Sequence, residues 1–473
     1  ATKAPTALAK EAWSGEFNQK NTFSFTEPEH KWINHEWLSQ YVLRLVFLEY
    51  GTTGLLALKV LLGLLVMGLI YILARKDCSS DVILFFYLLL TISTMGYGYS
   101  MRPHHFTYLF LAILLTLLRR FSDSRPVVIA AAAPILGCVW ANFHGAFIVG
   151  LGLLLLFTIF RTVEFIRFRE ALGIRAGNLV YLYLAVVLFL CATLINPYGA
   201  DLWRFVIESA GIMRPYLSEW AMFDPSADYM THPDFIVLVV IIVMTLLVSR
   251  ESKSAAWILI LLSTLAAALF MKRNIPLFAI VAGFVITGHI DSVAGGFLNR
   301  ITGRIPTAIK VVTLCSFIAV SSAYAWKFEK AEPLKIEVSR SKFPVDAVEF
   351  MKKHEMKGNL LVFWDWAEYC IWHLYPNCRV FTDGRFTDAY DIKTVNDHFN
   401  FIYGRPEWSH ALANYSTEIV LIHRQNPVYL KMTMLPWWKR VYEDDLAAIF
   451  IKSRETIAPA TSAPSGSAAA SRN

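Results

Sequence analysis

A histidine and a glutamate stand side by side in a polar stretch just before the first long apolar run of the chain. The stretch reads KWINHEWLSQ and carries His35 and Glu36 between Trp32 and Trp37. Tryptophan favours the boundary between water and lipid, so an interfacial belt accounts for the two rings. It does not account for the imidazole and the carboxylate, which suit general acid–base chemistry or metal binding. We therefore predict that His35 and Glu36 are catalytic.

Two further motifs carry cations that suit an anionic ligand. Arg102 precedes His104 and His105, and guanidinium groups bind phosphate through two parallel hydrogen bonds. Lys272 and Arg273 form the second motif. Anchoring at the membrane interface is the alternative role of Arg102. We predict that all five residues bind the phosphate of a donor molecule.

A third set of polar residues has more evenly balanced alternatives. Asn142 and His144 interrupt a long apolar run in WANFHG, where a buried histidine that stabilises a helix break is as good an explanation as a ligand-binding one. Asn196 and Tyr198 lie in INPYG, whose sequence first of all predicts a turn. The remaining three lie near the C-terminus, where TDGR would also form an internal salt bridge. The predicted substrate-binding residues are Asn142, His144, Asn196, Tyr198, Asp365, Asp383 and Arg385.

The composition predicts a polytopic α-helical membrane protein. Of the 473 residues, 56% are hydrophobic and 17% charged, whereas soluble domains have about 25% charged residues. The net charge of +7 does not indicate nucleic-acid binding, because the basic residues fall in short loops. About ten apolar segments have a length that suits a bilayer. They cover residues 52–74, 81–99, 105–118, 126–142, 144–160, 178–195, 235–249, 255–271, 275–293 and 306–325.

The loops between these segments alternate in charge. One set of alternate loops holds fourteen Lys and Arg residues and the other set five, so the first set is expected in the cytoplasm. The polar motifs then lie at the outer ends of the spans, and residues 1–50 lie outside. Because 1–50 contains no apolar segment, we expect a membrane helix that precedes this chain. We also expect a helix break between Asn142 and Gly145.

The domain organisation follows from these patterns. Residues 1–50 form an outer segment with an interfacial helix, 51–326 the transmembrane domain, and 327–454 an extracytoplasmic α/β domain. Strands are predicted at NLLVFWDW, CRVFTDGR, TEIVLIHR and LAAIFIKS, with helices between them. The low-complexity tail 455–473 is predicted to be disordered. Cys370 and Cys378 permit a disulfide without requiring one, and no cysteine or histidine pattern suggests structural zinc.

With these residues identified, the chain resembles bacterial polytopic glycosyltransferases of the GT-C fold. Relatives of that group include protein O-mannosyltransferases, the lipid A aminoarabinose transferase and oligosaccharyltransferase. The likeness runs from about residue 14 to 453 and depends on the order and spacing of several motifs. They are Thr22–Thr26 with Trp32–Leu38, Arg102–Leu109, Trp140–Gly150, Asn196–Gly199 and Phe343–Arg385.

The resemblance implies transfer of a sugar from a polyprenyl-phosphate donor to an acceptor glycan, lipid or protein. The reaction is expected on the outer face of a bacterial inner membrane, and a divalent metal ion is an open alternative. In one respect the chain departs from the family, because ATKAPTALAKEA replaces an Asp-rich motif of the first outer loop. The alternative is therefore a non-catalytic accessory or structural subunit of a membrane-protein complex. A transporter fits least well.

Overall fold

The computed structural model describes residues 20–98, 100–121, 126–168, 176–212, 214, 216–303, 305–306 and 338–453. They form two compact units, which are described separately. The helical unit lies within Ile33–Glu337, and the C-terminal unit combines Lys20–Trp32 with the chain from Val338 onward. Nearly all of the expected last apolar segment, and the whole low-complexity tail, lie outside the described residues.

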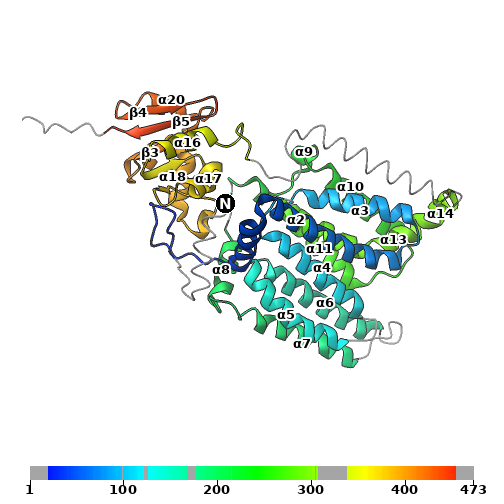
Figure 1. Ribbon diagram of the computed structural model, residues 1–473. Coiled ribbons are helices and arrows are strands. Elements are labelled where there is room, and N and C mark those ends of the chain that lie inside the picture. Colours follow the sequence, from blue (N-terminus) through cyan, green and yellow to red (C-terminus); the bar gives the residue numbers. More distant parts are fainter. Residues whose placement is uncertain are drawn as a thin grey trace, which may run out of the picture. The chain divides into compact units, whose positions relative to one another are not determined.

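The helical unit is a bundle whose members run side by side (Figure 1). Helix α5 packs against α7, α2 against α4, and α11 against α6 and α12. Its longer helices are α2 (Trp37–Asp77), α3 (Asp81–Gly96), α4 (His104–Arg120), α5 (Pro126–Phe143), α6 (Phe147–Phe168), α7 (Ala176–Ala192), α8 (Asp201–Ala210), α10 (Pro233–Val248), α11 (Ala255–Phe270) and α12 (Ile275–Val285). Shorter helical segments are η2 (Ser218–Trp220), α9 (Pro225–Asp228), η3 (Lys272–Asn274), α13 (Thr287–Ile290), η4 (Asp291–Gly295) and α14 (Gly296–Thr302).

Helix α12 forms the centre of this bundle. It is apolar around its whole circumference, and every residue from Ile275 to Val285 is buried. A helix without a polar face has to be covered on all sides, and α2, α3, α4, α10 and α11 all contact α12. Pro276 stands in its first turn, where a missing backbone N–H has no cost.

Helix α2 has 41 residues but is interrupted at Gly51. A straight helix of that length would extend about 60 Å, twice the apolar thickness of a bilayer. Gly51 has φ 62° and ψ −151°, a conformation that essentially only glycine adopts without strain. The N-terminal part of α2, Trp37–Tyr50, thus ends where the apolar segment predicted over 52–74 begins.

Three helices are long and apolar enough to cross a membrane, namely α2, α5 and α6. A fourth span results if two consecutive helical stretches, Lys272–Val285 (η3 with α12) and Thr287–Thr302, are counted as one. The two stretches meet at a bend of 58°. These helices indicate a membrane-associated protein. The expected number of about ten spans is wrong for the residues described, because α3, α7, α10 and α11 are apolar but shorter.

The helix break predicted between Asn142 and Gly145 is confirmed. Helix α5 ends at Phe143 and α6 begins at Phe147. The His144 backbone N–H still donates to the Trp140 carbonyl, and Phe147 donates to the His144 carbonyl. The chain therefore reverses in a tight turn that holds His144 at its centre.

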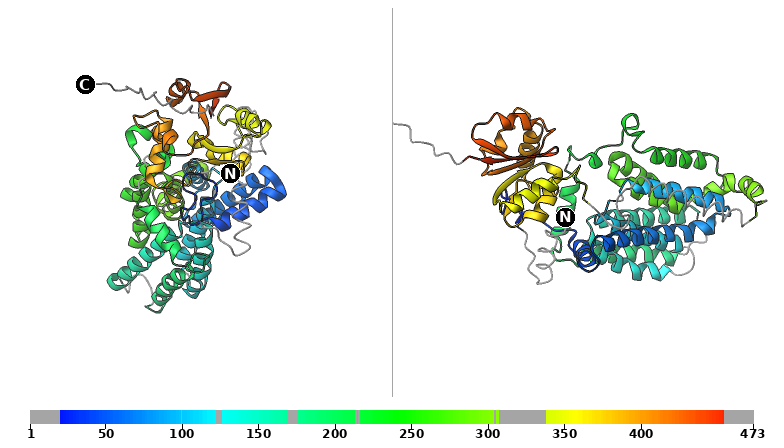
Figure 2. Two further views of the ribbon diagram at one scale, coloured as in Figure 1. Left: turned by 90° about the vertical axis from the view of Figure 1, so that its left-hand side faces the viewer. Right: turned by 45° about the horizontal axis from the view of Figure 1, so that its top comes forward.

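The C-terminal unit is a mixed five-stranded sheet in the order β2-β1-β3-β5-β4. Strand β1 pairs in parallel with β2 and β3, whereas β5 pairs antiparallel with β3 and β4. Figure 2 shows this sheet with helices against it. The strands are β1 (Gly358–Val362), β2 (Cys378–Val380), β3 (Ile419–His423), β4 (Trp438–Glu443) and β5 (Ala447–Lys452). The helices are α16 (Val345–Lys353), η5 (Trp364–Trp366), α17 (Ala367–Leu374), η6 (Phe386–Asp388), α18 (Ile392–Ile402), α19 (His410–Ala413) and α20 (Val428–Thr433).

The four predicted strands correspond to β1, β2, β3 and β5, so the expected α/β organisation of this unit is confirmed. Strand β4 was not predicted. Its sequence WKRVYE carries three charges and no clear alternation, as is common at the edge of a sheet.

The segment Lys20–Trp32 covers the opposite edge of the sheet, beside β2. The Val380 backbone N–H donates to the Phe23 carbonyl (2.9 Å), and the Phe25 N–H donates to the Val380 carbonyl (3.2 Å). The Ser24 hydroxyl also donates to the carbonyl of Phe381. These bonds satisfy an edge that would otherwise expose unpaired backbone groups.

Candidate functional site

The two predicted catalytic residues lie at the start of α2, beside the turn between α5 and α6. Glu36 directly precedes the helix, where the positive end of the helix dipole favours a carboxylate. Its Oε1 lies 3.4 Å from Nε2 of His144 and 3.8 Å from Nε2 of His35. The side chain of Glu36 is 25% exposed and that of His144 is 9% exposed. One carboxylate, open to a substrate, therefore lies between two imidazoles.

The neighbours of His144 determine which ring nitrogen carries its proton. Trp140 Nε1 donates to Thr107 Oγ1 (2.9 Å), and this oxygen lies 3.0 Å from His144 Nδ1. Because an indole can only donate, the Thr107 hydroxyl hydrogen is left to point at Nδ1. The Ala146 backbone N–H also donates to Nδ1, at 3.3 Å. Two donors at Nδ1 place the ring proton on Nε2, where it faces Glu36.

This arrangement orients the carboxylate for proton transfer. The Nε2–H of His144 approaches one carboxylate oxygen of Glu36, and the second oxygen is left to accept a proton from a substrate hydroxyl. Sequence reasoning did not assign Thr107 or Trp140 to the site. The structure shows that Gly150 makes room for Trp140, since a Cβ there would lie 2.3 Å from Trp140 Cζ3. Only glycine lets the indole occupy its place.

Asn142 links the two sides of the site. Its Oδ1 accepts a hydrogen bond from Trp37 Nε1 (3.0 Å), and its Nδ2 donates to the carbonyls of Cys138 and Ile195, both at 2.8 Å. All of its polar atoms are thus occupied within the protein. Asn142 positions the start of α2 against α5, and Trp37 has a specific partner beyond an interfacial role.

The INPYG motif forms the turn that its sequence predicts. Asn196 Nδ2 donates to the carbonyls of Thr193 and Gly199, and its Oδ1 accepts the Tyr198 backbone N–H. Gly199 has φ 54°. The role of Asn196 in forming the turn therefore accounts for its side-chain contacts. Tyr198 reaches further, since its hydroxyl accepts the backbone N–H of Asn34, next to His35.

The predicted phosphate-binding cations are paired with acidic or aromatic groups. Arg102 Nη1 lies 3.0 Å from Oε2 of Glu219, and Lys272 Nζ lies 2.9 Å from Oδ1 of Asp228. The Arg102 pair is largely exposed, whereas the side chains of Lys272 and Asp228 are 12% and 11% exposed.

The guanidinium group of Arg273 lies over the ring of Trp220 at 4.4 Å, and Arg214 lies over the same ring at 4.0 Å. Both guanidinium groups lie within the distance at which a ring attracts a cation. The structure thus places an aromatic ring and Arg214 beside a predicted cation, and the sequence analysis missed both.

The two histidines at the start of α4 contact backbone carbonyls. His104 Nε2 donates to the Gly98 carbonyl at 2.6 Å, and His105 Nδ1 donates to the Arg102 carbonyl at 3.1 Å. His105 is 1% exposed, so contact with a ligand is not supported for its ring. The prediction that it binds phosphate has no geometric support, because its side chain is enclosed by the bundle.

The three remaining predicted residues belong to the C-terminal unit. Asp383 and Arg385 form a two-point ion pair, with Asp383 Oδ1 2.8 Å from Arg385 Nε and Asp383 Oδ2 2.6 Å from Arg385 Nη2. The Tyr390 hydroxyl also donates to Asp383. Burial favours a higher pKa for Asp383, but the adjacent guanidinium outweighs it and holds that pKa below its ordinary value. The internal salt-bridge alternative accounts for this pair, and Asp365 is exposed in η5.

Cys370 and Cys378 are both buried free thiols, so no disulfide joins them in the structure. Burial raises the pKa of the Cys378 thiol to about 11, which keeps it in the unreactive protonated form. Among the residues that the structure describes, a group of three potential metal ligands lies elsewhere, at Glu27, His30 and Asp391.

No family model matches the sequence, and no curated protein is significantly similar to it.

Proposed function

We propose that the chain is a membrane glycosyltransferase-like protein that moves one sugar from a polyprenyl-phosphate donor to a hydroxyl of an acceptor glycan, lipid or protein. The observation that carries the proposal is the Glu36 carboxylate between the imidazoles of His35 and His144.

In the proposed reaction Glu36 is the general base. The acceptor hydroxyl oxygen attacks the anomeric carbon of the donor and its proton passes to Glu36. The bond between the anomeric carbon and the phosphate oxygen breaks, and its electron pair leaves with the polyprenyl phosphate. The sugar is therefore transferred with inversion. His144 positions the carboxylate, and Arg102 with Lys272 and Arg273 would steady the leaving phosphate.

The proposed location is a bacterial inner membrane, with the reaction and the C-terminal unit on the outer face. In this proposal the apolar helices of 16 and 17 residues, α3, α7, α10 and α11, lie in the membrane with the longer ones. Together with the three long helices and the bent pair they would make eight spans, and about ten spans with a GT-C-like arrangement require that the segments expected over 105–118 and 306–325 also cross.

One observation favours a second function, a non-catalytic accessory subunit of a membrane-protein complex. Arg102 and Lys272 are each neutralised by a carboxylate, Glu219 and Asp228. A phosphate would have to displace these partners, which costs part of the binding free energy. An accessory protein would keep such pairs as structural links.

The proposal is tested with Glu36→Gln, which preserves the shape of the side chain and removes the base. Membranes containing each variant are supplied with a radiolabelled polyprenyl-phosphate sugar and the endogenous acceptor fraction. Glu49→Gln is the matched control, because Glu49 lies exposed on the same helix. We expect transfer to fall by about 100-fold in the first variant, the usual contribution of a general base, and to be unchanged in the second.

Arg102→Ala and Lys272→Ala test the phosphate contacts in the same assay. A higher Michaelis constant for the donor in either variant supports them, and unchanged transfer in both would rule out a phosphate clamp. If wild-type membranes transfer no sugar and Glu36→Gln leaves co-purifying membrane proteins unchanged, the accessory role is the better account.

A further inference from the structure

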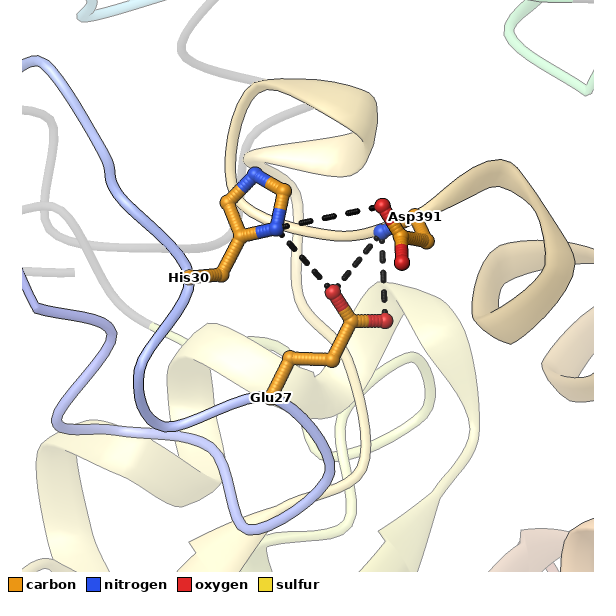
Figure 3. Close-up of side chains that lie close together, drawn as sticks. All are labelled: Glu27, His30 and Asp391. Atoms are coloured by element: carbon orange, nitrogen blue, oxygen red, sulfur yellow. Dashed lines mark hydrogen bonds and ion pairs between the residues drawn. The ribbon is translucent and has the colours of Figure 1, made fainter.

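A cluster of one imidazole and two carboxylates lies in the C-terminal unit, and none of its three residues belongs to the sites assigned above. Glu27 and His30 belong to the segment that covers the sheet edge, and Asp391 directly precedes α18 (Figure 3). The His30 backbone N–H donates to the Glu27 carbonyl at 3.2 Å. This turn places the two side chains on the same side of the loop, facing Asp391.

The distances within the cluster suit a divalent transition-metal ion. His30 Nδ1 lies 3.1 Å from Glu27 Oε2 and 4.0 Å from Asp391 Oδ1, and one ligand atom of each residue lies within 4.8 Å of the others. Around a tetrahedral Zn²⁺ with bonds of about 2.0–2.1 Å, neighbouring ligand atoms are about 3.3 Å apart. The His30–Glu27 separation is close to this value, and the Asp391 carboxylate would have to move nearer to complete three ligands.

The charges in the cluster also call for a cation. Two carboxylates this close repel each other unless a positive charge lies between them. A protonated His30 supplies one positive charge against these two acids, whereas a divalent ion would neutralise both and use the imidazole nitrogen as a ligand. One nitrogen and two oxygens form a donor set that Zn²⁺, Co²⁺ and Mn²⁺ accept.

The surrounding backbone orients the Glu27 carboxylate, and the cluster is accessible from solvent on the side of Asp391. Both oxygens of Glu27 accept the backbone N–H of Asp391, at 2.9 and 3.1 Å, and these bonds orient the carboxylate as outer partners of metal ligands do. The side chain of Glu27 is 16% exposed and that of Asp391 is 76% exposed. An ion can therefore enter from the Asp391 side and keep a water molecule as its fourth ligand.

We propose that Glu27, His30 and Asp391 bind a divalent transition-metal ion of the zinc class, which fastens the segment Lys20–Trp32 to the start of α18. The ion closes a loop of more than 350 residues and stabilises the C-terminal unit by binding only its folded form. This role does not depend on sugar transfer.

The test uses the purified full-length chain in detergent, freed of metal with a chelator. Calorimetric titration with Zn²⁺ is expected to show one saturable site, and Co²⁺ is expected to give the visible absorption of a four-coordinate ion. His30→Gln and Asp391→Asn should each weaken Zn²⁺ binding by at least tenfold. His354→Gln and Glu29→Gln, exposed residues of the same unit, are the matched controls.

Hydrogen exchange of Lys20–Trp32 provides a second readout. Zn²⁺ should slow exchange of this segment in the wild type and in both controls, and not in His30→Gln. The absence of a saturable site would overturn the proposal. Zn²⁺ binding of equal affinity in all variants would do so too, because it would then arise from other surface groups.

Discussion

Replacing Asp383 with asparagine is expected to destabilise the C-terminal unit strongly. The side chain of Asp383 is 3% exposed and that of Arg385 is 17% exposed. The carboxylate accepts hydrogen bonds from the Arg385 Nε, Nη2 and backbone N–H groups and from the Tyr390 hydroxyl. Asparagine keeps one acceptor oxygen, but it removes the charge and turns an NH₂ group toward a buried guanidinium.

The magnitude follows from what the substitution leaves behind. Breaking a buried ion pair by removing one partner costs about 3–5 kcal/mol. Arg385 retains a hydrogen bond to Asn21 Oδ1 and lies over the ring of Trp32 at 4.9 Å. The cost in free energy of unfolding therefore falls near the lower limit, about 3 kcal/mol. This corresponds to a change of about 100-fold in the equilibrium constant for unfolding of the C-terminal unit.

Amide hydrogen exchange on the full-length protein measures this change without assuming that the whole chain unfolds in one step. Amides of β1 and β3 should exchange about 100-fold faster in Asp383→Asn, while those of α6 in the helical unit should not change. Asp445→Asn is the matched control, because Asp445 is exposed at the turn between β4 and β5. A change of less than threefold in β1 and β3 would refute the reasoning. Replacing Arg385 with methionine in the same variant should recover part of the loss.

Three further predictions concern single side chains. Burial and the nearby Asp383 carboxylate raise the pKa of Glu368 to about 7 from 4.5. The stability that the protonated Glu368 side chain contributes is therefore fully present below pH 4.5 and is lost as the pH rises through 7. Glu368→Gln should melt at a higher temperature than the wild type at pH 8 and at the same temperature at pH 4. Thr107→Val removes a donor to His144 Nδ1, so side-chain ¹⁵N chemical shifts should reveal a mixture of imidazole tautomers, and unchanged shifts would contradict the assignment. Glu164 accepts the Ala256 backbone N–H at the start of α11 and forms a buried ion pair with Arg161, so Glu164→Ala should cost about 3 kcal/mol, seen as faster exchange in the first turn of α11 and in the part of α6 around Arg161.

Local features of the fold were predictable because neighbouring residues determine them. The turn around His144 follows from polar residues and glycine inside an apolar run, and the strands β1 and β3 follow from short runs of β-branched and apolar side chains. Strand β4 was missed because its charged sequence has no strand pattern of its own, and the segment becomes a strand only by pairing with β5. Among the described residues, fewer helices than expected reach the length of a membrane span, because an apolar run does not fix the length of its helix.

The residues of the candidate site were predictable from the sequence, but the contacts between their side chains were not. Sequence reasoning identified Glu36 and His144 separately, from the polar motifs at the ends of apolar segments. That they approach within 3.4 Å depends on the packing of α2 against α4 and α5. Similarly, the cation Lys272 was evident, and its neutralisation by Asp228 was not.

The sequence by itself determined the apolar helices, the tight turns and the residue types able to perform chemistry, because these depend on near neighbours along the chain. Only the tertiary structure decided which charges are paired, which nitrogen of His144 faces Glu36 and which acids flank His30. Such contacts join positions as far apart as His30 and Asp391. Their energies arise from burial and distance in three dimensions, and no local pattern encodes them.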